Sequence, residues 1–414
     1  MKPFSSNSIH EFTDSQKNTI QQSIQVFKDS LKSFNNTKNP MPSQISPWSY
    51  TSEECTHEMY KSEFTHWLKE RRWDQLFYKI NDYKRDLGSF LRNYKEPNRQ
   101  YSGRGVVYSC HHRLVSITMI SIRFLRHHGS TLPVEVWYSI FQELYFLTRR
   151  HYNELTNMDI YKLESLAGVT VRNLADFLYY EFPRDKDGKI FALKTASIIH
   201  SKFDEVLFLD SDNNAVQDPT FLFDSPAFVE TGAVFWKDLW KTRPDNPIWN
   251  FLGLACVDEF EQESGQILLK KSFPGVQKAL DLAYLMQMQS EFYFELTPGD
   301  KDTFRLSWRL LNQPFHLVRP HMAVLGPYQE MSGSYCGQSM VQYAPYWGKD
   351  VYGVEPIGHL DPRDGPQILF VHANSLKYQA HLGKETVYFF RKGSFIDFII
   401  DFWKSQALQA PYYP

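Results

Sequence analysis

VLFLDSDN, residues 206–213, is the stretch of the sequence that decides the fold. Its four apolar residues predict a short strand buried in a parallel sheet, and the polar residues behind them predict that the strand ends at Asp210. Open α/β sheets bind ligands in the crevice at the carboxyl ends of their strands. Asp210 and Asp212 project to the same side of an extended chain, so both carboxylates can face one divalent cation such as Mn²⁺ or Mg²⁺. Two aspartates at a strand end also cap turns, and the rest of the chain has to decide between these interpretations.

The segments before this strand have the alternating order of an α/β domain. Residues 105–110 and 132–138 predict two strands, and residues 113–128 predict the helix between them. This β-α-β order is typical of the opening of a nucleotide-binding sheet. Three further predictions complete this half of the chain: a helix at 139–149, short elements around Leu163 and Val169, and a helix at 191–200.

The first predicted strand is not followed by the sequence G-x-G-x-x-G. A dinucleotide-binding domain needs these glycines for the turn that holds the pyrophosphate. We therefore expect a metal ion in place of a glycine-rich cradle, which favours the metal-site interpretation of Asp210 and Asp212.

Polar residues that suit a hydroxyl-rich ligand follow the two aspartates. We predict a turn and short helix at 218–223 and a strand rimmed by polar groups at 230–236. The sequence QESGQ at 262–266 predicts a small polar turn that enters a further strand.

A second acidic pair, Asp300 and Asp302, precedes a helix predicted to begin at Phe304. Capping of that helix would explain Asp302 or Thr303. Asp300 is also a candidate for a carboxylate at a reacting centre.

A histidine leaves the last predicted strand, residues 368–371, as His372. A histidine at a strand end can complete the coordination of a cation begun by two carboxylates. Lys377, five residues further on, could reach a diphosphate.

The composition limits the classes of ligand. With 45 Lys and Arg against 47 Asp and Glu, the formal net charge of -2 gives no global field for nucleic acid or an anionic membrane surface. Aromatic residues make up 16% of the chain, which suits stacking on sugars or bases as well as core packing. The chain has no apolar run of 18 residues, and its first residues lack the features of a signal peptide, so no transmembrane segment is expected.

The four cysteines lack the C-x-x-C spacing of zinc or thioredoxin-like sites. In a secretory compartment they could form up to two disulfides. These cysteines are Cys55, Cys110, Cys256 and Cys336. Residues 35–37, NNT, form an acceptor sequence for N-glycosylation.

Five motifs in order resemble the fungal Golgi α-mannosyltransferases that extend mannans and protein-linked glycans with α-1,2 or α-1,3 mannose. The resemblance covers roughly residues 103–378. The motifs are FALK at 191–194, VLFLDSDN at 206–213, ETG at 230–232, ESGQ at 263–266 and GDKDTF at 299–304.

The resemblance implies a GT-A type glycosyltransferase domain, with a mixed, mostly parallel nucleotide-binding sheet flanked by helices. It also implies GDP-mannose as donor, a mannose-containing glycan as acceptor, Mn²⁺ or another divalent cation, and retention of anomeric configuration. Such proteins usually have an N-terminal membrane anchor and a stem in the Golgi lumen, and no anchor is visible in this chain.

On this reading Asp210, Asp212 and His372 hold the cation against the two phosphates. Lys194 and Lys377 add positive charge beside the diphosphate. The cation and the lysines would stabilise the departing GDP.

The remaining site predictions concern the sugars. Glu263 and Asp300 are the candidate catalytic carboxylates, and Ser264, Gly265 and Gln266 are the candidate donor-binding residues. Retention needs either a carboxylate nucleophile or front-face attack, and the residues favour neither.

We expect three parts in the chain. Residues 1–55 form a partly disordered stem or linker, residues 56–102 form a helical extension packing on the catalytic domain, and residues 103–414 form the catalytic domain.

Two alternatives share the same residues. A glycogenin-like or galactosyl-type transferase with a UDP-sugar donor would show the same carboxylates and histidine, and a catalytically silent relative could bind glycans on the same fold. A nuclease or phosphatase with a two-carboxylate site is less favoured because further His and Asp clusters are missing.

Overall fold

The computed structural model of the chain describes the following residues: 80–141, 152–177, 182–183, 190–244, 246–297, 299–329, 334–335, 339–345, 368–373 and 387–389. The predicted stem at 1–55, the glycosylation sequence and Lys377 lie outside these residues. The chain divides by its internal contacts into two units, residues 1–95 with 243–258 and residues 96–242 with 259–414. Residues 243–258, which the sequence analysis assigned to 103–414, therefore group with the first unit.

Two helices of the first unit are described, α4 (Ile80–Asn93) and α10 (Pro247–Leu252). Helix α4 buries Ile80, Tyr83 and Leu87, which the spacing of three and four residues places on one face. It is one amphipathic helix of the predicted extension, of which residues 56–79 lie outside the described residues. Asn246 caps α10 by accepting a hydrogen bond from the Ile248 amide at 2.9 Å.

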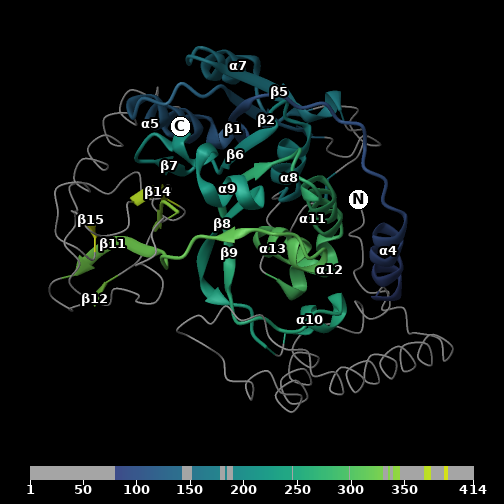
Figure 1. Ribbon diagram of the computed structural model, residues 1–414. Coiled ribbons are helices and arrows are strands. Elements are labelled where there is room, and N and C mark those ends of the chain that lie inside the picture. The colour runs from purple at the N-terminus through teal and green to yellow at the C-terminus, as the bar shows by residue number, and fades with distance from the viewer. Residues whose placement is uncertain are drawn as a thin grey trace, which may run out of the picture. The chain divides into compact units, whose positions relative to one another are not determined.

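A seven-stranded sheet with the order β10-β8-β9-β6-β1-β2-β5 forms the centre of the second unit (Figure 1). Within the described strands of this sheet, β9 runs antiparallel to both of its neighbours, and the other pairs are parallel. The predicted fold class, a mixed and mostly parallel sheet with flanking helices, is confirmed. The strands are β1 (Arg104–Ser109), β2 (Val134–Tyr138), β5 (Val169–Asn173), β6 (Glu205–Leu209), β8 (Ala233–Lys241), β9 (Phe260–Lys270) and β10 (His316–Leu317).

Both faces of this sheet are covered, which explains the continuous apolar runs in its strands. In β6, Leu207 and Leu209 pack into one hydrophobic core and Val206 and Phe208 into the other, because successive side chains point to opposite faces. The first core is shared with α5 (Val115–His127), α7 (Asn157–Glu164) and α9 (Pro226–Thr231). The second core is shared with α8 (Ala192–His200), α11 (Val276–Met288) and α13 (Lys301–Leu310), which lie together in Figure 1.

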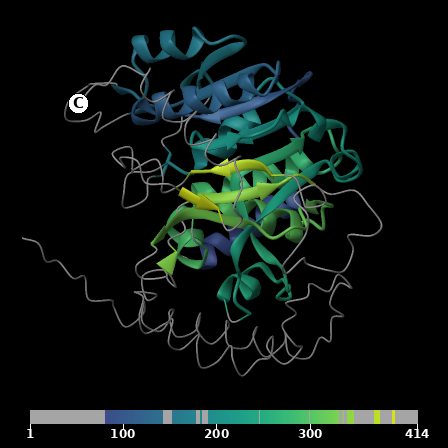
Figure 2. The ribbon, with the colours of Figure 1, turned by 90° about the vertical axis from the view of Figure 1, so that its left-hand side faces the viewer.

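A smaller sheet continues from the central one. Its order is β12-β11-β13-β14-β7, and β15 pairs with β11. Figure 2, in which the left-hand side of Figure 1 faces the viewer, shows its later strands in green and yellow. The strands are β7 (Asn213–Ala215), β11 (Ala323–Gln329), β12 (Ser334–Tyr335), β13 (Ser339–Tyr343), β14 (Ile368–His372) and β15 (Val387–Phe389).

The remaining described elements are short. They are the strand pair β3 (Ile140–Phe141) and β4 (Tyr152–Asn153), helix α12 (Ser290–Leu296), and the 3-10 helices η1 (His112–Leu114), η2 (Leu174–Asp176) and η3 (Pro219–Asp224).

Two predicted elements differ from the structure because of local context. The predicted helix at 139–149 is wrong at Ile140–Phe141, where antiparallel pairing with β4 overrides the helical spacing of the apolar residues. Residues 142–150 lie outside the described part. The predicted strand at 230–236 begins only at Ala233, because Gly232 adopts a left-handed conformation with φ 66° that ends helix α9.

The predicted polar turn at 262–266 is also wrong. These residues lie inside β9, which is paired with β6 on one side and β8 on the other. A central strand tolerates this run of polar residues only where their side chains find partners in the interior, and these partners belong to the site described next.

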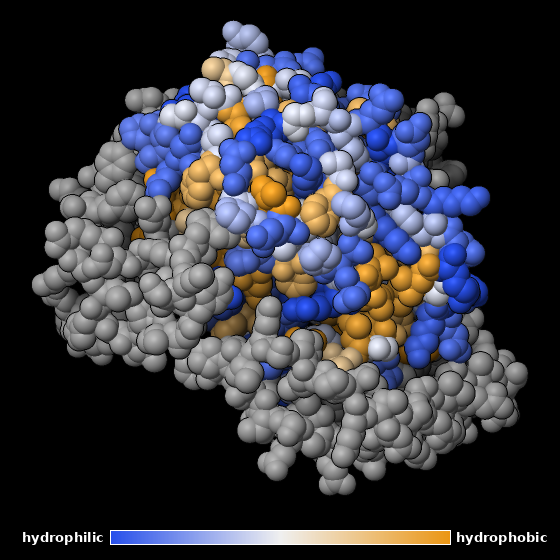
Figure 3. Space-filling view, in the orientation of Figure 1, coloured by the Kyte–Doolittle hydropathy of each residue, from blue (hydrophilic) through white to orange (hydrophobic). Residues whose placement is uncertain are grey.

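The surface of the described residues mixes polar and apolar side chains. Figure 3 shows apolar areas in orange among hydrophilic ones. Large exposed apolar side chains include Tyr161 on α7 and Trp240 at the end of β8. Among the described helices, none combines the length and the apolar character that crossing a bilayer requires.

Candidate metal centre

Asp210, Asp212 and His372 meet at the corner between the two sheets. Asp210 follows the last residue of β6, and Asp212 precedes β7. The corner is closed by a hydrogen bond from the Asn213 amide to the Asp210 carbonyl at 2.9 Å. His372 reaches the corner because it ends β14, which pairs with β7. One possible ligand atom from each of the three side chains lies within 4.8 Å of the others.

The three ligand atoms suit a hard or borderline divalent cation. His372 Nε2 lies 3.2 Å from Asp212 Oδ1 and 4.0 Å from Asp210 Oδ2. Two carboxylate oxygens and one imidazole nitrogen are a donor set for Mn²⁺, and carboxylates also suit Mg²⁺. The Asp210 side chain is 26% exposed, whereas Asp212 and His372 are buried, so the group is reached from the side of Asp210.

The pKa values of Asp210 and His372 are shifted by burial and by the charges of neighbouring side chains. Burial raises the pKa of Asp210 to about 6, although the positive charges of Lys194 and His372 oppose this rise. Burial lowers the pKa of His372, but the carboxylates of Asp212 and Glu263 outweigh it and raise the pKa well above its ordinary value. A cation bound at Nε2 would have to displace the proton that these carboxylates favour.

Ser211, between the two aspartates, holds the corner from behind. Its hydroxyl donates to the Ser109 carbonyl at 3.0 Å and lies 2.8 Å from Thr118 Oγ1. Ser109 ends β1 and Thr118 belongs to α5, so both neighbouring layers fix the turn. The roles of Ser211 and Thr118 are not visible in the sequence, because their contact joins residues that are 93 positions apart.

Lys194, on α8, brings a positive charge to the carboxylates. Its ammonium group donates to Asp210 Oδ2 at 3.1 Å and to Ser264 Oγ at 2.9 Å, and it lies 3.2 Å from Asp300 Oδ2. Burial lowers the pKa of Lys194, but Asp210, Asp300 and Glu263 outweigh it and raise the pKa above its ordinary value. The lysine is therefore charged and fixed.

Asp300 and Asp302 do not act as helix caps with their side chains. Asp300 stands at the N-terminus of α13 without a side-chain capping hydrogen bond. Asp302 Oδ1 instead accepts from Arg305 Nη2 at 2.8 Å and from the Gln262 amide at 3.3 Å. Of the two, Asp300 is the carboxylate that lies beside Lys194.

Glu263 and Gln266 lie behind the metal ligands. Glu263 Oε1 lies 3.0 Å from His372 Nδ1, and Glu263 Oε2 accepts from Gln266 Nε2 at 2.6 Å. The side-chain oxygen of Gln266, Oε1, in turn accepts from Asn213 Nδ2 at 2.6 Å. Burial raises the pKa of Glu263, but the positive charge of His372 and the Gly265 amide outweigh it and lower the pKa. Apart from Lys377, every site residue named from the sequence is thus within one connected group.

The strand order, the single antiparallel strand β9 and the acidic corner after β6 define a glycosyltransferase domain of the GT-A type. The chain matches the family model described as "Mannosyltransferase putative" over residues 103–257 and 256–344, more than half of its length. It belongs to this mannosyltransferase family.

The chain is similar to curated proteins that are named α-1,2-mannosyltransferases. The chain is 25% identical to the α-1,2-mannosyltransferase MNN21 of Candida albicans, with 89% of this chain and 65% of the relative covered. It is 22% identical to the α-1,2-mannosyltransferase MNN2 of Saccharomyces cerevisiae, with 66% and 51% covered. The chain therefore spans about half to two thirds of the length of these relatives.

Solved structures are more distantly similar. An active-site mutant of LgtC aligns with a TM-score of 0.37 and 12% identity, covering 52% of this chain and 72% of that chain. The apo form of mouse xyloside xylosyltransferase 1 aligns with a TM-score of 0.32 and 14% identity, covering 53% and 85%.

Proposed function

We propose that the protein is a retaining α-mannosyltransferase that transfers mannose from GDP-mannose to a hydroxyl of a mannose-containing glycan. Membership of the mannosyltransferase family and the names of the relatives support the sugar. The observation that carries the proposal is the meeting of Asp210, Asp212 and His372 at the edge where α/β sheets bind ligands.

In this proposal Asp210, Asp212 and His372 hold Mn²⁺ or another divalent cation. When bound, such a cation neutralises the charge that develops on the departing diphosphate. Lys194 adds a fixed positive charge beside the same position, and Lys377 is proposed for the same role from the sequence alone.

The sugar-facing side of the site is proposed to include Asp300. Its side chain is 8% exposed, and Oδ2 forms an ion pair with Lys194 Nζ at 3.2 Å but accepts no hydrogen bond from a hydroxyl or amide of the described residues. A buried acceptor of this kind suits a sugar hydroxyl or a transient positive charge at the reacting carbon. Ser264 also accepts a hydrogen bond from Lys194. We propose that Ser264 and the neighbouring backbone at Gly265 line the donor pocket.

We further propose that the protein works in the lumen of the Golgi. Cys256 is disulfide-bonded, and disulfides persist in secretory compartments. Cys110 is a free and buried cysteine, and burial raises the pKa of its thiol to about 12, so it is poorly suited to exchange.

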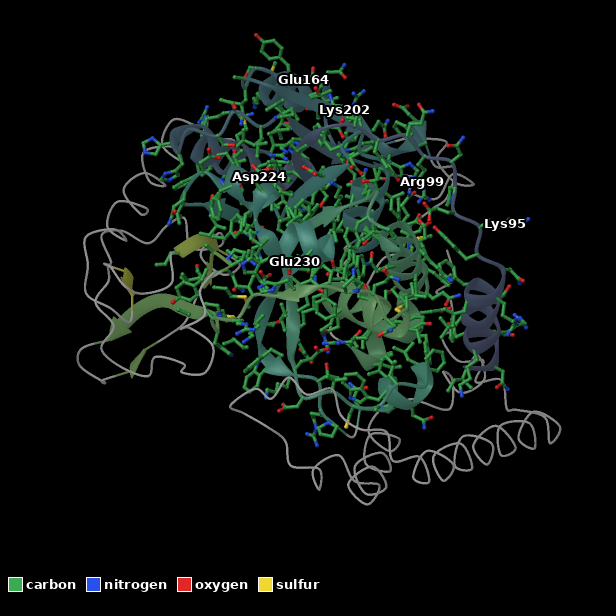
Figure 4. The ribbon with its side chains drawn as sticks, in the orientation of Figure 1. Lys95, Arg99, Glu164, Lys202, Asp224 and Glu230 are labelled. Atoms are coloured by element: carbon green, nitrogen blue, oxygen red, sulfur yellow. The ribbon has the colours of Figure 1, made fainter. Side chains whose placement is uncertain are left out.

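The test is transfer by the purified chain from GDP-mannose to α-mannobiose with Mn²⁺, followed by linkage analysis of the product. We expect Asp212→Asn to lower the rate by at least about a hundred-fold, because a first ligand of the cation is lost. The control is Glu230→Gln, at an exposed residue of α9 (Figure 4), which should transfer at the normal rate.

UDP-glucose and UDP-galactose are assayed in parallel. Faster transfer from either of them would favour the UDP-sugar alternative and reject GDP-mannose. Retained glycan binding without transfer from any donor would favour a silent relative. Normal transfer by Asp212→Asn would reject the metal centre.

A further inference from the structure

We propose that Glu263 is a positioning residue, which orients the His372 imidazole toward the cation and does not contact the sugar. The proposal rests on the proposed function, since it takes Asp210, Asp212 and His372 as ligands of a divalent cation. It assigns Glu263 a role different from the catalytic one expected from the sequence.

The carboxylate of Glu263 is occupied by donors of the protein itself. Oε1 accepts from the Gly265 amide at 2.7 Å and faces His372 Nδ1 at 3.0 Å, and Oε2 accepts from Gln266 Nε2 at 2.6 Å. A carboxylate has about four lone-pair directions, so these donors leave little for a substrate hydroxyl. The Glu263 side chain is also only 6% exposed.

The contact with Nδ1 determines which ring nitrogen of His372 can bind a cation. A carboxylate at Nδ1 keeps the proton on that nitrogen, so the lone pair of the neutral ring is at Nε2. Nε2 is the atom that faces Asp212 Oδ1 at 3.2 Å. Glu263 thus selects both the tautomer and the orientation that the metal centre needs.

Strand β9 is adapted to this contact. A Cβ atom at position 265 would stand 2.5 Å from His372 Nδ1 and 2.8 Å from Glu263 Oε1, so only glycine allows the two side chains to meet. Gln266 holds Glu263 from the other side and is itself held by Asn213, the residue after Asp212. A satisfied buried network of this kind is rigid, and it connects the histidine ligand to the acidic corner.

Asp300 shows the opposite pattern. Its Oδ2 atom forms an ion pair with Lys194 Nζ at 3.2 Å, but no hydroxyl or amide of the described residues donates to it, so lone pairs are left for a sugar hydroxyl. The two carboxylates expected at the reacting centre therefore separate into one available to the substrate, Asp300, and one committed to the ligand His372, Glu263.

The experiment measures Mn²⁺ binding to the full chain in the absence of donor, using the electron paramagnetic resonance signal of free Mn²⁺. Glu263→Gln keeps the shape of the side chain but places an amide nitrogen against a donor, the Gly265 amide or Gln266. We expect Mn²⁺ affinity to fall by about 10- to 100-fold. The rate of transfer should then recover as the Mn²⁺ concentration is raised.

The matched control is Glu261→Gln, two residues away on the same strand. Glu261 is similarly buried and pairs with Lys301 at 2.6 Å, away from His372. Its loss should leave the affinity for Mn²⁺ at the level of the unmodified chain. Melting curves of both variants verify folding, and Glu263→Asp, whose carboxylate is one methylene too short to reach Nδ1, replaces Glu263→Gln if the latter does not fold.

The outcomes separate this proposal from the proposed function. Unchanged Mn²⁺ affinity with a lower rate that Mn²⁺ does not restore would show that Glu263 acts on the substrate, and would overturn the inference alone. Absence of Mn²⁺ binding by the unmodified chain, or undiminished binding by Asp212→Asn, would overturn the metal centre and with it both proposals.

Discussion

Gly265 lies in β9 beside the imidazole of His372. Because glycine has no side chain, there is room for this imidazole ring. Gly265→Ala would place a methyl group 2.5 Å from Nδ1 and push the ring away from Asp212. We expect Mn²⁺ affinity to fall at least about ten-fold. The free energy of unfolding should fall by about 1–3 kcal/mol because the site becomes overpacked. Mn²⁺ titration and denaturant unfolding measure the two effects.

Gly105→Ala is the matched control at the same scale. In β1 a Cβ at this position would stand 2.4 Å from the ring of Phe203. The steric clash is therefore similar in size, but it falls on Phe203 and not on His372. This variant should lose stability and keep its Mn²⁺ affinity. If Gly265→Ala also kept its affinity, His372 would not be held as the structure describes.

At the scale of elements, the corner between β6 and β7 depends on its contacts with β1 and α5. Ser211→Ala removes the hydrogen bond to the Ser109 carbonyl and leaves Thr118 without its contact to Ser211 Oγ. We expect the free energy of unfolding to fall by about 1–3 kcal/mol, because the buried Thr118 hydroxyl loses its acceptor and the partly buried Ser109 carbonyl loses its donor. Mn²⁺ affinity should fall as well, since the two carboxylates are no longer fixed.

Ser307→Ala provides the comparison for this prediction. Ser307 is equally buried, and its hydroxyl donates to the Thr303 carbonyl at 2.7 Å within α13. Its loss should lower stability without any change in Mn²⁺ binding. Equal Mn²⁺ affinity in both variants would mean that Ser211 does not position the carboxylates.

The same elements show what a single sequence can predict. The strand before Asp210 was predictable because a strand buried on both faces is a continuous apolar run. The polar residues of β9 were interpreted as a turn because their partners are remote: Gln266 meets Asn213 across 53 positions, and Glu263 meets His372 across 109. Such pairs are created by the sheet order, which local patterns do not contain. The need for glycine at 265 was hidden for the same reason.

At the scale of the whole molecule, the pH dependence of stability should include a contribution from Lys271. The residue is 1% exposed, and burial lowers the pKa of its amine to about 6. A neutral amine has two N–H groups and one lone pair. The two N–H groups can donate to the Ile198 carbonyl at 3.0 Å and the Ser201 carbonyl at 2.7 Å. The lone pair can accept from the Ser201 hydroxyl at 3.2 Å.

The sign of this contribution follows from proton linkage. Between pH 6 and the ordinary pKa of 10.5, the unfolded chain binds one proton more at Lys271 than the folded chain, so stability rises with pH in this window and is lower at its acid end. One proton corresponds to a slope of about 1.4 kcal/mol per pH unit.

Lys271→Met should lose this slope in denaturant unfolding between pH 7 and 9. Lys270→Met, at the half-exposed neighbour that pairs with Glu205 at 3.1 Å, should retain it. Identical slopes in the two variants would show that Lys271 stays charged in the folded protein.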